Sequence, residues 1–258
     1  MSAKSDLHEH AVAKSIDASI KGLSAERPKV ATSFPDVKVE YKNFTGTNAV
    51  WVEVKMNHTD NLMNPRFSYI NGKWVTPDSY KSPATDMLCD IWNKNKEVKE
   101  WIEGLKIFLV KNKWKGDIKK MSLYSSKTER NRDPNSVSLD LMKKYLKSLP
   151  NKNICKVQNI DVGTLVSTHY LKGKAAAAYY LSSGDDFYQF KLSGVKNNPL
   201  KIPDVPVFEG MNQIILRVGD RSDNFEIQAE VKVKSLKSSK YSVAPGTKKE
   251  NPFRYIKV

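Results

Sequence analysis

A pair of alternating segments near the N-terminus constrains the fold of this chain more than any other feature of its sequence. Residues 36–41, DVKVEY, and residues 49–56, AVWVEVKM, alternate apolar and polar side chains with the period of a β-strand. The intervening segment, NFTGTN, has the composition of a turn, with Gly46 near its centre. We therefore predict an antiparallel β-hairpin with one apolar face and one polar face.

The second strand of this hairpin carries ionisable groups on its polar face. Alternation places Glu53 and Lys55 on one side of the strand, opposite an apolar side. That apolar side consists of Val50, Val52, Val54 and Met56. A register that pairs Tyr41 with roughly Ala49 brings Asp36 to the same end of the hairpin. Asp36 then lies opposite the residue next to Glu53, so two carboxylates and one ammonium group converge.

This trio has a chemical use. Carboxylate oxygens are the ligands that Mg²⁺ prefers, and a bound cation polarises a phosphate and lowers the pKa of water. A lysine beside them can orient that water or stabilise charge that grows on the phosphate. The alternative is an ordinary exposed hairpin face with solvated ion pairs. We expect a site for phosphodiester hydrolysis that uses Mg²⁺, with Mn²⁺ as a substitute.

The dipeptide PD ending at Asp36 and the tripeptide EVK from Glu53 to Lys55 resemble the motif of the PD-(D/E)xK, or restriction-endonuclease-like, nuclease superfamily. The resemblance covers residues 5–57. It implies an α/β fold with a mixed central sheet flanked by helices. It also implies that Asp36 and Glu53 are catalytic metal ligands and that Lys55 is catalytic.

The superfamily often adds an acid from a helix that precedes the hairpin. Apolar residues at helical spacing predict a helix over residues 5–22, and Glu9 extends their inward stripe. By resemblance, Glu9 is the expected third metal ligand and a further catalytic residue. Helix capping is the alternative, because Asp6 and Glu9 have the spacing of a capping box. Glu26 and Glu40 are alternates for the third acid.

The charge of the chain favours a polyanionic partner. Lys and Arg total 43 against 28 Asp and Glu, a formal net charge of +15. Residues 91–160 alone contain 17 basic and 7 acidic side chains. Basic residues that neutralise phosphates release counterions, so we predict DNA, in double-stranded form, as the partner. A lysine-rich surface that only confers solubility is the alternative.

Five residues are predicted to contact DNA. Asn57 and His58 leave the active strand in the polar run NHTDN, for which an Asx-rich turn is the alternative. Lys172 and Lys174 flank a glycine and could bind phosphate. The full set is Asn57, His58, Arg66, Lys172 and Lys174.

The whole chain, residues 1–258, is predicted to form a single nuclease domain. Residues 1–120 would form its catalytic core, and residues 121–258 would add helices and C-terminal β-hairpins that grip DNA. Other predicted elements are a connector at 24–35, a short hairpin around 71–73, a helix from about 84, a buried strand at 106–110, a polar loop at 123–136, helices at 137–149 and 161–173, and hairpins that turn at 183–185 and 219–224.

Composition excludes several classes of protein. No segment approaches the roughly 18 apolar residues that span a membrane, and the polar start MSAKSDLHEH lacks a secretory signal. Cys89 and Cys155 lie far apart without metal-site spacing, so we expect free thiols in an intracellular protein. The sequence has no Walker A motif, which argues against a self-contained translocating nuclease.

The expected function is therefore a Mg²⁺-dependent DNA endonuclease. Sequence-specific cleavage by a homodimer, as in restriction enzymes, is its expected form by analogy. A non-catalytic DNA-binding protein that retains a nuclease-like fold is the alternative from another class. A junction resolvase or repair exonuclease is a third, although ~200 residues beyond the motif region favour a protein with its own substrate-reading region.

Overall fold

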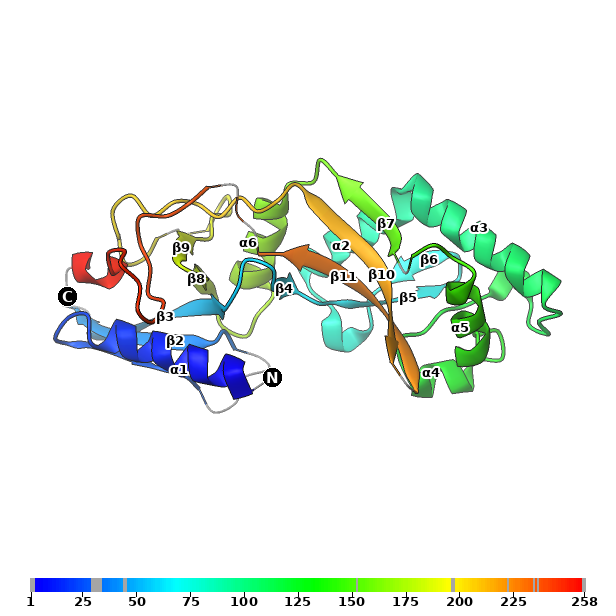
Figure 1. Cartoon of the computed structure of the whole chain (residues 1–258), viewed down its shortest axis with the longest axis horizontal. Helices are drawn as coiled ribbons and strands as arrows, with labels where there is room; N and C mark the ends of the chain where they lie inside the picture. The colour runs from blue at the N-terminus through cyan, green and yellow to red at the C-terminus, as the bar shows by residue number, and fades with distance from the viewer. Residues whose placement is uncertain are drawn as a thin grey trace. The chain divides into compact units, whose positions relative to one another are not determined.

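The chain forms two compact units that are each assembled from distant parts of the sequence (Figure 1). The computed structural model describes residues 3–28, 34–43, 46–151, 153–195, 198–221, 223–233, 235 and 237–256. Unit 1 contains Met1–Leu62, Asp161–Met211 and Lys232–Val258, and unit 2 contains Met63–Ile160 and Asn212–Val231. The boundary expected at residue 120 lies inside unit 2. Both units mix helices and sheets, so the predicted α/β class is confirmed.

Unit 1 is built on a mixed sheet with the strand order β1-β2-β3-β8-β9. Its strands are β1 (Leu23–Glu26), β2 (Val37–Asn43), β3 (Gly46–Lys55), β8 (Ala178–Ser183) and β9 (Asp186–Gln189). β3 and β8 pair in parallel, and the other neighbours pair antiparallel. The predicted hairpin is confirmed as β2-β3, and the one turning at 183–185 as β8-β9.

The register of β2-β3 differs by one residue from the prediction. Tyr41 pairs with Asn48 instead of Ala49, and Val37 pairs with Val52. The last pair joins Asn43 to Gly46, and each β2 residue pairs with the β3 residue one position before the expected one. Residues 29–33, 44–45 and 222, which the sequence analysis assigned to the connector and the turns, lie outside the described residues.

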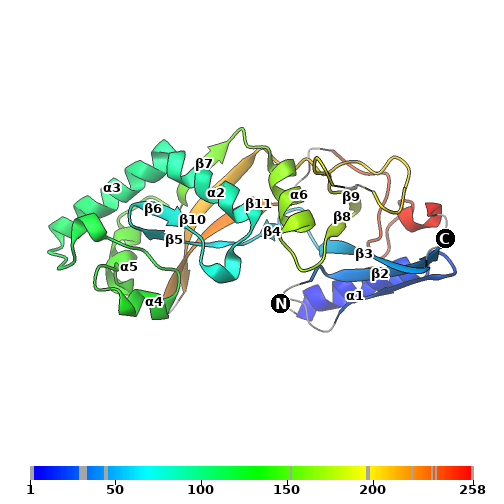
Figure 2. The ribbon, with the colours of Figure 1, turned by 180° about the vertical axis from the view of Figure 1, so that it is seen from behind.

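Two helices of unit 1 contact this sheet. The predicted N-terminal helix is confirmed as α1 (Ala3–Asp17), which lies in front of β2 in Figure 1 and behind it in Figure 2. Its buried Val12 and Ile16 pack with Val52 and other apolar residues of the hairpin. The second helix, α6 (Val162–Lys172), contacts β8. Because parallel strands cannot be joined by a tight turn, the chain passes through unit 2 and α6 between β3 and β8.

The second sheet has the strand order β6-β5-β11-β10-β7, with β4 paired to β11. Its strands are β4 (Asn61–Met63), β5 (Arg66–Ile70), β6 (Lys73–Val75), β7 (Asn153–Gln158), β10 (Gln213–Arg221) and β11 (Asn224–Lys232). The α-helices of unit 2 are α2 (Pro83–Lys94), α3 (Lys96–Lys111), α4 (Lys127–Arg132) and α5 (Leu139–Lys147). The hairpins predicted near residues 71–73 and 219–224 are both confirmed.

Three predictions of local structure were wrong. Residues 106–110 continue α3 instead of forming a buried strand, and Ile107 is 57% exposed and Val110 65% exposed. A short run of apolar residues does not by itself distinguish a β-strand from part of an amphipathic helix. The expected loop at 123–136 contains α4, whose N-cap Ser126 accepts a hydrogen bond from the Glu129 backbone. The expected connector contains β1, a four-residue edge strand too short to show alternation.

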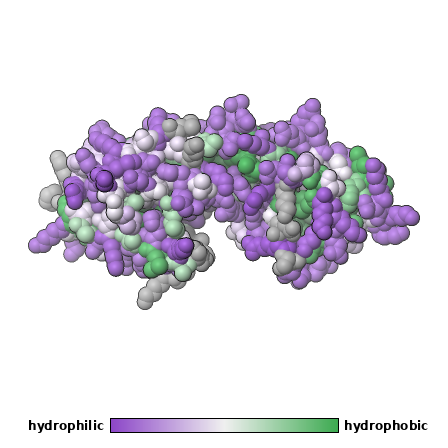
Figure 3. Space-filling model, in the orientation of Figure 1, coloured by the Kyte–Doolittle hydropathy of each residue, from purple (hydrophilic) through white to green (hydrophobic). Residues whose placement is uncertain are grey.

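Short 3₁₀-helices complete the described structure. They are η1 (Asp78–Tyr80), η2 (Ile118–Lys120) and η3 (Pro252–Tyr255). Hydrophilic residues cover most of the face shown in Figure 3. Both cysteines, Cys89 and Cys155, are free, as predicted, and both are buried. Within the described ranges, no helix combines the length and the apolar character needed to cross a membrane.

Candidate active site

The structure brings together the three residues of the motif at one end of β2-β3. Asp36 directly precedes β2, and its Oδ2 accepts a hydrogen bond of 2.9 Å from the backbone nitrogen of Val54. Glu53 and Lys55 lie at the end of β3, where the Lys55 ammonium donates to Glu53 Oε1 at 2.6 Å. The Asp36 side chain is therefore fixed to the strand that carries the other two groups.

The two carboxylates of this site are buried, which changes their charge states. Asp36 is 9% exposed and Glu53 is 4% exposed. Burial, followed by the charge of Glu53, raises the pKa of Asp36 to about 8. Burial also opposes the charge of Glu53, but Lys55 and Lys174 outweigh it and lower the pKa of Glu53. At neutral pH the site therefore holds an ionised Glu53–Lys55 pair beside an Asp36 that tends to keep its proton.

The ammonium group of Lys55 remains charged in this environment. Burial favours its neutral form, but the charges of Glu53 and Asp36 raise the pKa of Lys55 above its usual value. A permanently charged lysine cannot act as a base or as a metal ligand. It can hold Glu53 in place and stabilise negative charge on a substrate.

Glu9, the expected third ligand, lies near the motif but is already paired. It is 3% exposed, and its charge contributes to the raised pKa of Asp36. Its Oε1 accepts from Ser5 at 3.0 Å, and its Oε2 accepts from Arg27 Nε at 2.5 Å. Arg27 also pairs with Asp6 at 2.8 Å. Arginine thus neutralises Glu9, and nothing in the local sequence pattern around Arg27 indicated this contact.

The alternates for the third acid lie elsewhere. Glu40 forms an ion pair with Lys38, and the Glu26 side chain is exposed on β1. Neither residue is among the main causes of the pKa shifts of Asp36 and Glu53.

α6 contributes a tyrosine that the sequence analysis missed. The Tyr170 hydroxyl lies 2.9 Å from Glu53 Oε1 and 2.5 Å from the carbonyl oxygen of Leu62. Its ring stacks on Phe190, with the ring centroids 4.8 Å apart. Lys174, which follows the helix, lies 5.9 Å from the centroid of the Tyr170 ring. In the sequence, Tyr170 has the helical spacing of an ordinary core residue, so no local signal pointed to it.

The residues predicted to contact DNA are dispersed. The charge of Lys174 helps to lower the pKa of Glu53, and Lys172 is exposed at the end of α6. His58 lies in the turn after β3, between Ser183 Oγ at 3.3 Å and Asp186 Oδ2 at 3.6 Å.

The other two members of that set have structural partners. The backbone nitrogen of Asn57 donates to the Asp60 side chain at 3.0 Å, which closes the turn after β3. Arg66 belongs to unit 2, where it forms an ion pair of 2.6 Å with Glu226.

The donors at the site fit a divalent cation. Asp36 Oδ2 and Glu53 Oε1 accept all the hydrogen bonds that the described residues make to these two carboxylates. Asp36 Oδ1 and Glu53 Oε2 accept no hydrogen bond from this described part of the chain and suit a ligand. Among the described residues, no group of three or more His, Cys, Asp and Glu side chains has a metal-binding arrangement. Two carboxylates nevertheless suit Mg²⁺, which usually takes its other ligands from water and substrate phosphate.

The comparisons with known proteins found no relative of this chain. No protein-family model, no curated protein and no solved structure matches this chain. What the chain does must therefore be inferred from the residues of the site.

Proposed function

We propose that the protein is a Mg²⁺-dependent DNA endonuclease of the PD-(D/E)xK kind. The observation that carries this proposal is the buried carboxylate pair of Asp36 and Glu53 with Lys55 beside it. An ordinary hairpin face would leave such groups in water, because burial of ionisable groups costs stability, as the raised pKa of Asp36 indicates. A site that binds a cation and a phosphate accounts for that cost.

The order of elements in unit 1 also supports the proposal. The resemblance implies a mixed sheet, a motif on a hairpin and a helix before it. Unit 1 has α1 before the hairpin β2-β3 and a parallel strand, β8, beside β3. The motif lies where β2 begins and β3 ends, so its side chains lie at the same end of these two neighbouring strands.

Each residue of the site has a defined role in the proposal. Asp36 and Glu53 would hold Mg²⁺ or Mn²⁺ through Asp36 Oδ1 and Glu53 Oε2, which accept no hydrogen bond from the described residues. The cation would polarise the scissile phosphate and supply a nucleophile at neutral pH. Lys55 stabilises the charge that develops on the phosphate or orients the attacking water. Glu9, held by Arg27, remains the proposed third acid of the site.

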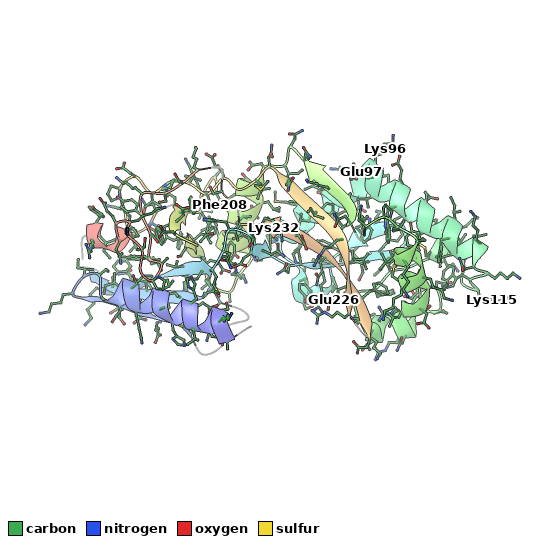
Figure 4. The ribbon with its side chains drawn as sticks, in the orientation of Figure 1. Lys96, Glu97, Lys115, Phe208, Glu226 and Lys232 are labelled. Atoms are coloured by element: carbon green, nitrogen blue, oxygen red, sulfur yellow. The ribbon has the colours of Figure 1, made fainter. Side chains whose placement is uncertain are left out.

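A lysine-rich segment of unit 2 supports DNA as the substrate. Five lysines within residues 111–120, here called the lysine loop, are all exposed, and the described residues form no ion pair with them. The loop is ordered, because Asp117 accepts from the Lys119 backbone and donates its own backbone N–H to Asn135, each at 2.9 Å. Figure 4 shows Lys115 beyond the end of α3. The five are Lys111, Lys113, Lys115, Lys119 and Lys120.

The proposed function is tested with purified protein and supercoiled plasmid. We expect cleavage with Mg²⁺ or Mn²⁺ and none with EDTA. Discrete bands would indicate a site-specific enzyme, and a smear would indicate a nonspecific one. Intact plasmid under all conditions, with DNA still bound, would favour the non-catalytic DNA-binding alternative.

DNA binding should weaken steeply as salt increases. If roughly 6 phosphates are neutralised, affinity should fall by about three orders of magnitude between 50 and 200 mM salt. Replacement of Lys113, Lys115 and Lys119 with glutamine should lower the slope of log affinity against log salt by about 2.7. Fluorescence anisotropy of a labelled duplex, with a cleavage-deficient Asp36→Asn background, measures both quantities.

The matched control removes three exposed lysines from another part of unit 2. Lys73, Lys81 and Lys94 are exposed and have the same charge. Their replacement with glutamine should leave the salt slope nearly unchanged. Equal slopes for the two triple variants would show that the positive charge acts diffusely and that the lysine loop has no special role.

A further inference from the structure

Both donors to the Glu53 carboxylate reach the same oxygen. The Lys55 ammonium lies 2.6 Å from Glu53 Oε1, and the Tyr170 hydroxyl lies 2.9 Å from that atom. Glu53 Oε2 receives no hydrogen bond from the described residues. A carboxylate held through one oxygen by donors from two directions cannot rotate freely. It presents its second oxygen in a fixed direction.

The surroundings of Tyr170 hold its hydroxyl in place. Tyr170 is 1% exposed, and its ring is nearly parallel to that of Phe190, with an interplanar angle of 9°. The hydroxyl also lies 2.5 Å from the carbonyl oxygen of Leu62. The hydroxyl has one proton, which Glu53 Oε1 and the Leu62 carbonyl share as acceptors. The stacked, buried ring therefore holds the hydroxyl between these two acceptors.

The buried Tyr170 hydroxyl does not need Glu53 as a hydrogen-bond partner. The Leu62 carbonyl would satisfy a buried hydroxyl by itself. Tyr145 of unit 2 is such a case: it is 5% exposed, and its hydroxyl donates to the Trp101 carbonyl oxygen at 3.2 Å. Tyr170 differs because its hydroxyl also reaches a carboxylate of the candidate active site.

We propose that Tyr170 is a positioning residue that orients Glu53 so that Oε2 faces the cation. This inference rests on the proposed metal-dependent function of the site. A neutral hydroxyl suits the task, because it fixes the carboxylate without adding positive charge that would repel the cation. Lys55 alone, on a flexible four-carbon chain, would allow the carboxylate to turn. Hydrogen-bond partners of metal ligands tune metal affinity in this way.

The test removes a single oxygen atom. In Tyr170→Phe, the affinity of the DNA-free protein for Mn²⁺ and Mg²⁺, measured by isothermal titration calorimetry, should fall by about 10-fold to 100-fold. The kcat for cleavage should fall while the KM for DNA stays unchanged, because the DNA-binding surface is intact. The control Tyr145→Phe deletes the equivalent oxygen in unit 2 and should change neither the cation affinity nor kcat. Thermal melting of both variants checks that they fold.

The outcomes separate this inference from the proposed function. Unchanged cation affinity in Tyr170→Phe, in a protein whose wild type cleaves DNA, overturns the role of Tyr170 and leaves the nuclease intact. Equal losses in Tyr170→Phe and Tyr145→Phe also overturn it, since they indicate a general structural effect. Weaker cation binding in Tyr170→Phe, in a protein that never cleaves DNA, supports the role and rejects the nuclease. A wild-type protein that binds no divalent cation contradicts both.

Discussion

Asp36→Asn and Glu53→Gln should each reduce DNA cleavage by about 10³-fold or more while the protein still folds and binds DNA. Each substitution removes one carboxylate from the pair that would hold the cation and keeps the size of the side chain. Cleavage of plasmid with Mg²⁺ and binding of labelled duplex measure the two properties separately. Wild-type rates in both variants would reject the proposed function.

The Asp36→Asn variant should also be more stable than the wild type without a divalent cation. Because the pKa of Asp36 is raised from 3.8 to about 8, the folded protein binds a proton that the unfolded chain releases. The cost to stability therefore grows as pH rises from about 4 to about 8. Asparagine keeps the hydrogen bond from Val54 without this cost. The free energy of unfolding should rise by about 2–4 kcal/mol at pH 7, and by less at pH 5.

A second buried carboxylate provides the control for this gain in stability. Glu226 of unit 2 is 3% exposed and pairs with Arg66 at 2.6 Å and Arg221 at 3.2 Å. Glu226→Gln should lower the melting temperature, because it leaves two arginines without their partner. If Asp36→Asn also lowers the melting temperature at pH 7, then Asp36 is a stabilising structural residue and not a strained functional one.

Lys55→Met should reduce cleavage by about 10²-fold or more and leave binding of DNA and of the cation in place. Methionine fills a similar volume but has no charge. An ammonium group repels a metal ion, so its contribution must lie with the attacking water or with charge on the phosphate, both of which matter mainly in the transition state. Single-turnover cleavage, beside calorimetry of cation binding, separates these effects.

The contact between Lys55 and Glu53 adds a further expected result. Without its partner at 2.6 Å, the buried Glu53 carboxylate should destabilise the cation-free protein, and Mn²⁺ should restore part of the lost melting temperature. The control is Lys38→Met, which removes a lysine of β2 that pairs with Glu40. Normal cleavage by Lys55→Met would reject the motif itself, and loss of cation binding would reject the assigned role.

The sequence by itself determined the local elements of the candidate site. Strand alternation over 36–41 and 49–56 was sufficient to predict the hairpin and the shared face of Glu53 and Lys55, because side-chain direction in a strand depends only on its period of two. Turn residues located the hairpin at Asn71-Gly72, and helical spacing located α1. These signals all act between residues close in the chain. The one-residue error in register arose because the end of pairing depends on the turn geometry.

The tertiary structure alone decided how these elements become a buried site. The parallel pairing of Glu53 with Leu181 joins residues far apart in the chain, and no local pattern specifies such a partner. The same long-range packing brings Tyr170 to Glu53 and Arg27 to Glu9, and it buries the carboxylates. The pKa of Asp36 follows from that burial and not from its sequence neighbours. The periodicity of a sequence shows which face of a helix or strand is apolar. The burial and charge pairing of its ionisable side chains depend on which distant element packs against it.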